Sequence, residues 1–221
     1  MTVREDQLAR KPANLSYAEA AAVPMAAVTA LLAVRDAGKT EPGQRLLING
    51  ASGGVGTFAV QLGRALGARV TAVCGSRHAD LVRSLGAIEV IDYRAEDFTR
   101  TGQRYDVVLD IAGSRPAMAC RRALARNGTL VLVGGPAGRW LQPAGHMFPA
   151  LALAPLVPQR ITLADTLRCG QKIDCLAALT KLIEDGQVTP VIDRCYGFEE
   201  LAAAVLYQAG GHAAGKVVVT V

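Results

Sequence analysis

The sequence has few cysteines and histidines, and they do not form a known metal-binding or disulfide pattern. Its 221 residues include three histidines and five cysteines, the latter at positions 74, 120, 169, 175 and 195, with no C-x-x-C pair. An odd number of widely spaced cysteines does not suit a disulfide framework. No cysteine stands at the distance from a histidine that zinc ligands usually show. We therefore predict reduced thiols, no bound metal and a cytoplasmic location.

A long apolar run and a block of like charge are also missing. Residues 18–34 are rich in alanine but contain Glu19 and Pro24, and residues 147–157 are short and twice interrupted by proline. Because a membrane-spanning helix needs about 20 mostly apolar residues, neither segment is predicted to cross a membrane. The net charge of +5 comes from scattered Lys and Arg. Without a basic run or interleaved aromatic residues, nucleic acid is not a predicted partner.

Strands and helices are predicted to alternate along most of the chain. The apolar pattern predicts strands at 45–49, 69–74, 89–92, 105–111, 128–133 and 160–163, and helices at 55–66, 79–85 and 116–124. Further helices are predicted at 175–184 and 198–207, and a strand at 216–221. Such alternation favours a parallel sheet covered on both faces. The predicted fold class is therefore α/β, a Rossmann-type doubly wound sheet, with residues 160–163 as an edge strand.

The glycine-rich stretch NGASGGVG, residues 49–56, joins the first predicted strand to its helix. Its register, Ala51-x-Gly53-x-x-Gly56, fits a dinucleotide-binding turn in which alanine replaces the first glycine. Backbone N–H groups at the start of the helix, around Gly54 and Val55, would face a pyrophosphate. Gly56 would let the helix pack close to the sheet. A turn that only tightens packing is the alternative, although two adjacent glycines exceed what packing requires.

The end of the second predicted strand bears on which nucleotide binds. About 20 residues after Gly56, where a carboxylate would hold the ribose of NAD, the sequence has Ser76, Arg77 and His78 instead. A guanidinium suits a 2′-phosphate, so these residues favour NADPH over NADH. The lack of a carboxylate also argues against a methyltransferase. Two alternatives stay open: Arg77 is a solvated residue of the next helix, or Asp80 supplies the carboxylate for NADH.

Four segments together resemble one family. They are LSYAEAAAVPMAAVTALLAV from residue 15, PGQRLLINGASGGVGTFAVQLGRALGARVTAVCGSR from residue 42, LVRSLGAIEVIDYRAEDF from residue 81, and LTKLIEDGQVTPVIDRCYGFEELAAAVLYQAGGHAAGKVVVTV at the C-terminus. In this order they resemble the nucleotide-binding part of the medium-chain dehydrogenase/reductase superfamily. The zinc-independent quinone oxidoreductase branch, which includes NAD(P)-dependent alcohol dehydrogenase-like members, fits best.

The resemblance implies a set of cofactor-binding residues. Thr29 matches a position beside the nicotinamide, Lys216 belongs to a tail motif that returns toward the cofactor, and Gly134, Gly135 and Pro136 match a loop along the nicotinamide half. Ala51, Gly53, Gly54, Val55 and Gly56 match the pyrophosphate turn. Ser76, Arg77 and Tyr93 match positions around the 2′-phosphate, and His78 stands where members carry lysine or asparagine. Gly75 departs from the hydroxyl residue expected there. A strand-capping Tyr93 and a simple turn at Gly134 and Gly135 are the alternatives.

The family pattern also implies a domain organisation. Residues 1–27 match a linker remnant, residues 28–164 the Rossmann domain, and residues 165–221 a segment that normally packs on an N-terminal GroES-like domain. This chain starts near the end of that domain, so no catalytic residue is assigned. The implied function is NADPH-dependent, metal-free hydride transfer to a quinone, an enone or a related carbonyl compound. The alternative is a non-catalytic NADP(H)-binding module or a partner-dependent half of such an enzyme. A homodimer through the edge strand near residues 159–164 is also expected.

Overall fold

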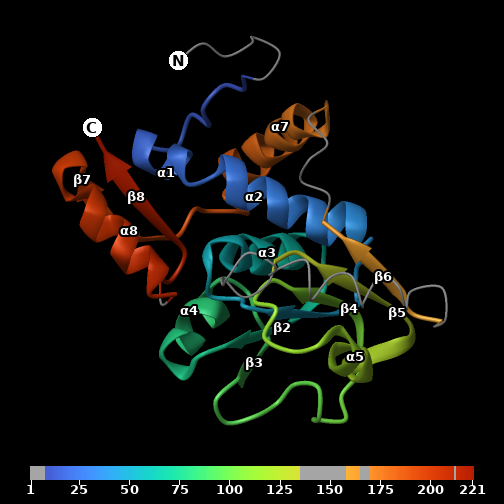
Figure 1. Ribbon diagram of the computed structural model, residues 1–221. Coiled ribbons are helices and arrows are strands. Elements are labelled where there is room, and N and C mark those ends of the chain that lie inside the picture. The colour runs from blue at the N-terminus through green and yellow to red at the C-terminus, as the bar shows by residue number, and fades with distance from the viewer. Residues whose placement is uncertain (1–7, 135–157, 165–169, 212) are drawn as a thin grey trace.

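A six-stranded parallel sheet forms the centre of the protein (Figure 1). The computed structural model describes residues 8–134, 158–164, 170–211 and 213–221. The strands of this sheet are β1 (Arg45–Asn49), β2 (Arg69–Cys74), β3 (Glu89–Asp92), β4 (Tyr105–Asp110), β5 (Leu124–Leu132) and β6 (Arg160–Leu163). Their order is β3-β2-β1-β4-β5-β6. From β1 the chain adds β2 and β3 on one side, and then returns to add β4, β5 and β6 on the other side. The boundary between β1 and β4 is therefore the topological switch point, where doubly wound folds bind ligands.

Both faces of the sheet are covered, as the predicted fold class requires. The helices around it are α1 (Tyr17–Ala21), α2 (Pro24–Leu31), α3 (Gly54–Ala65), α4 (Ala79–Ser84), α5 (Ala117–Cys120) and α7 (Gly170–Glu184). Leu46 and Ile48 of β1 join one core cluster with α2, α3 and α7, while Leu47 joins a second cluster with α5. Neighbouring side chains of β1 thus point to opposite, equally apolar faces. The doubly wound fold is confirmed.

The C-terminal part of the chain forms a second, smaller sheet beside the first. Strands β7 (Ile192–Gly197) and β8 (Lys216–Thr220) pair in parallel, and helix α8 (Leu201–Ala209) connects them (Figure 1). The start of β8 is attached to the glycine turn, because Gly215 N donates to Ser52 O at 2.9 Å. The chain before β7 is attached to α3 by a reciprocal pair, Gln61 Nε2 to Thr189 O at 2.9 Å and Thr189 N to Gln61 Oε1 at 2.8 Å.

Several predicted boundaries need correction. The helix expected at 116–124 is only α5 followed by a 3-10 turn, Arg121–Ala123, and β5 begins at Leu124 rather than at residue 128. Leu124 is buried and pairs with Tyr105, with a register shift before the next pair. Tertiary pairing thus overrides the local helical pattern. Helix α7 starts at Gly170, and residues 198–200 form a 3-10 turn before α8.

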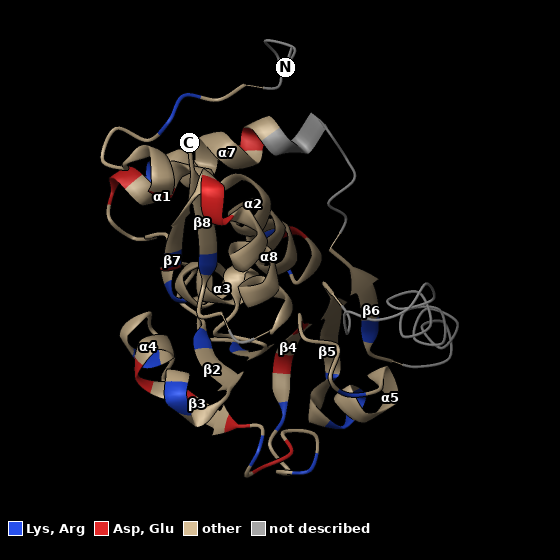
Figure 2. Cartoon of the chain, turned by 60° about the vertical axis from the view of Figure 1, so that its left-hand side comes forward, with Lys and Arg blue, Asp and Glu red and all other residues tan. Residues whose placement is uncertain are grey.

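The N-terminal helical segment is divided into α1 and α2. Pro24 occupies the first turn of α2 and separates it from α1, and a π-helix, Leu32–Ala37, follows α2. In the described parts of the chain, no helix has both the length and the apolar character needed to cross a membrane. Lys and Arg are spread over most elements and interspersed with acidic residues (Figure 2).

Candidate functional site

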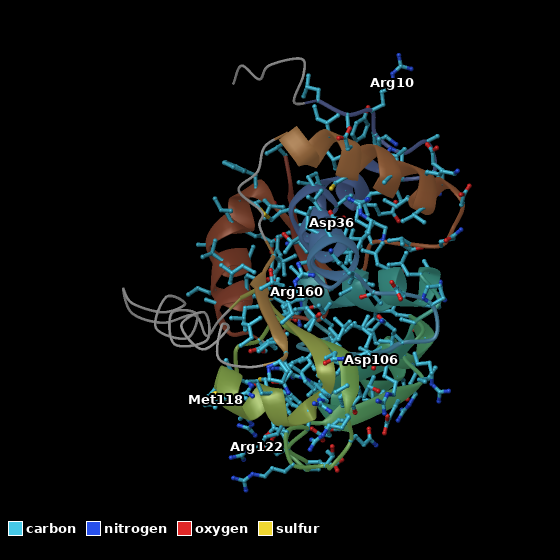
Figure 3. All side chains as sticks on the ribbon, turned by 90° about the vertical axis from the view of Figure 1, so that its right-hand side faces the viewer. Arg10, Asp36, Asp106, Met118, Arg122 and Arg160 are labelled. Atoms are coloured by element: carbon cyan, nitrogen blue, oxygen red, sulfur yellow. The ribbon has the colours of Figure 1, made fainter. Side chains whose placement is uncertain are left out.

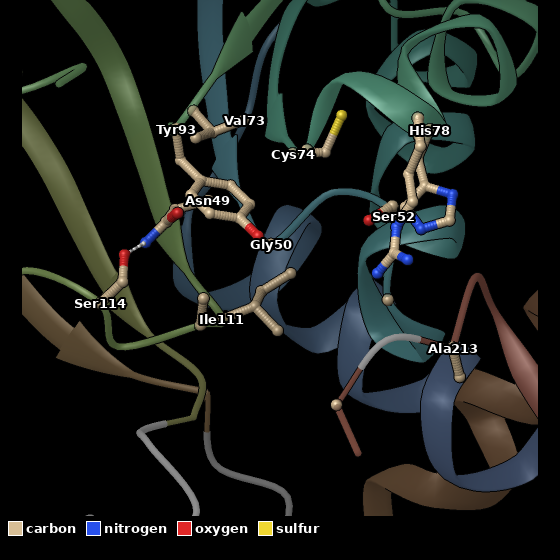
Figure 4. A pocket seen from close by; sticks show the side chains of 15 residues that line it. Asn49, Gly50, Ser52, Val73, Cys74, His78, Tyr93, Ile111, Ser114 and Ala213 are labelled. Atoms are coloured by element: carbon tan, nitrogen blue, oxygen red, sulfur yellow. Dashed lines mark hydrogen bonds between the residues drawn. The ribbon is translucent and has the colours of Figure 1, made fainter. Parts of the chain in front are cut away.

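A cavity of about 360 Å³ lies at the carboxyl edge of the large sheet, where β1, β2 and β4 end (Figure 4). Its walls come from the glycine turn, the end of β2, Tyr93 after β3 and the loop that follows β4. Gly211 and Ala213, which precede β8, complete it from the C-terminal part of the chain. The cavity therefore occupies the topological switch point of the sheet.

Gly53 shapes the cavity wall at the start of α3. It is the N-cap of this 12-residue helix, no side chain caps the helix, and the first turn contains no acidic residue. The positive end of the helix dipole therefore meets no capping side chain and no acidic residue that would compete with an anion, while Gly53 itself is bridged to Gly215 of the C-terminal part. A Cβ atom placed on Gly53 would meet only Gly50 O, at 3.6 Å. The space in front of Gly53 is thus open.

Lys216 reaches the same turn from the far end of the chain. A Cβ atom on Gly54 would lie 2.8 Å from Cδ of Lys216, so this side chain runs across the first turn of α3. The backbone link between Gly215 and Ser52 holds β8 in that place. Lys216 does not line the cavity itself. It adds positive charge beside an uncapped helix N-terminus.

The other residues of the predicted turn have packing roles. A Cβ atom on Gly56 would overlap Gly50 O and would lie 2.7 Å from the carbonyl carbon of Ala51. Ala51 is fully buried, and Val55 packs against the main core cluster. These three residues allow the close contact between β1 and α3 and do not line the cavity.

The end of β2 supplies the basic wall of the cavity. Arg77 and His78, in the 3-10 turn Ser76–His78, line it together with Tyr93, while Ser76 does not. Arg77 is exposed and is not part of any ion pair found within the described ranges. Asp80, the residue that would favour NADH, is fully exposed, pairs with Arg83 at 3.1 Å and is not part of the cavity.

Two predicted nicotinamide-side positions that the structure describes, Thr29 and Gly134, do not line this cavity. Thr29 is buried in α2, where its hydroxyl donates to Met25 O at 2.7 Å. Gly134 packs its backbone against the β4 loop, and a Cβ atom there would lie 2.6 Å from Ile111 O. Gly135 and Pro136 lie outside the described residues. Their roles at a cofactor stay predictions.

A polar network at the wall of the cavity was not predicted from the sequence. Asn49, the last residue of β1, donates from Nδ2 to Asp110 Oδ1 at 2.8 Å and to Ser114 Oγ at 3.1 Å. Gly113 N donates to the same Asp110 oxygen at 2.9 Å. One signal could have revealed it: Asn49 and Asp110 end two buried strands, and parallel strands bring such ends to one edge.

Cys74 also lines the cavity, but its thiol is poorly reactive. Burial raises the pKa of its thiol to about 11, and the negative charge of nearby Asp92 acts in the same direction. The thiol therefore stays protonated at neutral pH, and it is neither a ready nucleophile nor a ready metal ligand. Within the described ranges, no group of three His, Cys, Asp or Glu side chains could hold a metal ion. These residues thus do not fit a zinc site.

The sheet order and the glycine turn at its switch point define a Rossmann-type α/β protein, and comparison with known proteins gives its family. Residues 85–219 match the family described as zinc-binding dehydrogenase. The whole chain is 37% identical to the mitochondrial NAD(P)H oxidoreductase RTN4IP1 of Mus musculus, and 95% of it is 33% identical to the chloroplastic quinone-oxidoreductase QR1 of Triphysaria versicolor. The structure of the quinone oxidoreductase from Coxiella burnetii matches 96% of the chain with a TM-score of 0.83 and 28% identity.

The chain belongs to the zinc-binding dehydrogenase family of the medium-chain dehydrogenase/reductase superfamily, and within it to the quinone oxidoreductase-like members. The resemblance to quinone oxidoreductase-like members of this superfamily, inferred from the sequence, is thereby confirmed. The chain spans 60% of the mouse protein, 64% of the plant protein and 63% of the Coxiella protein.

Proposed function

We propose that the cavity binds NADPH and that the protein serves metal-independent hydride transfer from NADPH to a quinone, an enone or a related carbonyl compound. One observation carries the proposal. The uncapped N-terminus of α3 and the exposed Arg77 guanidinium face one cavity at the switch point of the sheet. The helix N-terminus suits the pyrophosphate and the guanidinium suits the adenosine 2′-phosphate, and NADPH carries both.

The glycine turn fits the pyrophosphate. The open space at Gly53 admits the ligand to the first N–H groups of α3, and the helix dipole favours its negative charge. Lys216 adds a cation beside this turn. The chain thus offers both hydrogen-bond donors and positive charge where the two phosphates would lie.

The end of β2 fits the adenosine 2′-phosphate. Arg77 offers a planar fork of donors, and His78 stands next to it on the cavity wall. Asp80, which would repel that phosphate, is engaged with Arg83 outside the cavity. The charge at this end supports NADPH rather than NADH.

Hydride transfer then depends on how the nicotinamide is oriented toward the acceptor. When bound, NADPH supplies a hydride. The residues of this chain hold its phosphates and exclude water from one side, and the described part of the chain brings no three His, Cys, Asp or Glu side chains together that could hold a metal ion. An acceptor that needs no metal must itself be electron-poor, as is a C=C bond conjugated to a carbonyl group. Quinones and enones share that feature, and quinone reduction is what two of the similar proteins are named for.

A non-catalytic NADP(H)-binding module is the second candidate. The chain spans about three fifths of its relatives, and Cys74 in the cavity is held protonated. Titration with NADPH and assay of NADPH oxidation against a panel of quinones and enones separate the two candidates. Tight binding without turnover of any acceptor would favour the module.

Arg77→Ala tests the assignment of the 2′-phosphate. We expect it to weaken NADPH binding by about 1.5–3 kcal/mol, the scale of a hydrogen bond to a charged group, and to leave NADH binding nearly unchanged. Calorimetric titration of both cofactors measures this difference. Arg83→Ala is the matched control, because Arg83 pairs with Asp80 outside the cavity. An equal loss for both cofactors would remove Arg77 from the phosphate site.

The edge position of β6 supports a homodimer, since no other strand among the described residues pairs with its outer side. β6 is the last strand of the sheet, and Arg160 lies on this side of the molecule (Figure 3). Ala164 N donates to Leu132 O of β5, so the alternate residue Leu163 directs its N–H away from β5. We expect sedimentation velocity at micromolar concentration to show a dimer, and Leu163→Pro to yield folded monomers whose unfolding temperature does not depend on protein concentration. A monomeric wild-type protein would contradict the dimer.

A further inference from the structure

We propose that Ser114 is a further ligand-binding residue of the cavity, whose hydroxyl donates to the pyrophosphate, and that Asn49 and Asp110 position it. The inference rests on the proposed function, since it assumes a dinucleotide in the cavity. It adds a second wall to the phosphate site, opposite the glycine turn.

The argument starts at the buried Asp110. Its side chain is fully buried at the end of β4, and its Oδ1 atom receives two N–H groups, from Asn49 Nδ2 at 2.8 Å and from Gly113 N at 2.9 Å. Because both partners are donors, this oxygen acts only as an acceptor. The amide of Asn49 must therefore turn its NH₂ group toward Asp110. The opposite orientation would place two oxygen atoms against each other.

The orientation of Asn49 fixes the role of Ser114. Asn49 and Asp110 are register partners of β1 and β4, the two strands that flank the switch point. The same NH₂ group of Asn49 also donates to Ser114 Oγ at 3.1 Å. The serine oxygen thus accepts, and its own hydrogen stays available. Within the described ranges, no group accepts a hydrogen bond from Ser114.

Ser114 lines the cavity, so its hydroxyl hydrogen can be donated to a ligand there. Ser114 is exposed on the cavity wall, and Figure 4 shows it beside Asn49, across from Ser52 and His78. The bond from Gly113 to Asp110 holds the loop that carries it. A phosphate at the N-terminus of α3 would meet N–H donors on one side and this hydroxyl on the other. Hydrogen bonds to an ionised oxygen are the stronger kind.

The test uses calorimetric titration of the full chain with two probes, NADPH and adenosine 2′-monophosphate, which has no pyrophosphate. Ser114→Ala is expected to weaken NADPH binding by about tenfold and to leave adenosine 2′-monophosphate binding unchanged. Ser114→Thr, which keeps the hydroxyl, should bind NADPH within about twofold of the wild type. Ser84→Ala removes an exposed hydroxyl outside the cavity and is the control.

The positioning role of Asn49 is tested by a double-mutant cycle. Asn49→Ser removes the NH₂ group that orients Ser114, so adding Ser114→Ala to it should cost clearly less than about tenfold in NADPH affinity. Thermal unfolding of each variant identifies any that fails to fold, and Ser114→Ala alone, at an exposed site, carries the test in that case. Full additivity would remove Asn49 as a positioning residue.

The outcomes separate the inference from the proposed function. If the wild type binds NADPH and Ser114→Ala binds it equally well, the inference is wrong and the proposed function stands. Equal losses for NADPH and adenosine 2′-monophosphate would also overturn it, because they would show a general role of the loop. If the wild type binds neither probe, the proposed function itself is wrong.

Discussion

Gly53→Val is expected to abolish the binding of NADPH and of NADH while the protein still folds. Gly53 has φ −79° and ψ 178°, an extended conformation that any residue adopts. The nearest atom to an added Cβ is Gly50 O, at 3.6 Å, so the side chain has room in the empty cavity. That room is the place where the pyrophosphate would approach the first N–H groups of α3. A branched side chain there blocks both cofactors, since both contain a pyrophosphate.

Calorimetric titration beside a thermal unfolding curve measures this effect. We expect no detectable heat of binding for either cofactor and an unfolding temperature close to that of the wild type. Gly53→Ala provides a graded control, because a single methyl group intrudes less and should weaken binding without abolishing it. The pattern also differs from that of Arg77→Ala, which should discriminate between the cofactors. A folded Gly53→Val that binds NADPH normally would mean that the turn is structural only.

The sheet could be predicted closely because its strands are buried on both faces. β1, β2, β3 and β6 have the predicted bounds, since a short apolar run between turn residues is typical of a buried parallel strand. The segment of residues 116–128 could not be predicted, because the start of β5 depends on pairing between Leu124 and Tyr105. β7 was missed, and its residues are all exposed or half-buried, which weakens the apolar signal.

The candidate site could be predicted only where it lies within one local motif. The glycine turn and Arg77 follow from spacing along the chain, and both border the cavity. Ser114 and Asn49 meet only because β1 and β4 lie side by side, which no local pattern encodes. Lys216 was named through family resemblance alone, and its contact with the glycine turn depends on how β8 is attached there.

Gly56→Ala is expected to lower the free energy of unfolding by about 3 kcal/mol, although it adds only one methyl group. The added Cβ would overlap Gly50 O and press on the backbone of Ala51, and neither is a flexible side chain that can move aside. Helix α3 would have to shift from β1 and loosen the contacts of Phe58 and Leu62, which are buried in the core. Urea denaturation followed by circular dichroism measures the loss, with Gly53→Ala as the control that should unfold like the wild type. If Gly56→Ala were equally stable, close packing would not be the reason for glycine at this position. The two glycines, three residues apart, would then have to be explained by the ligand alone.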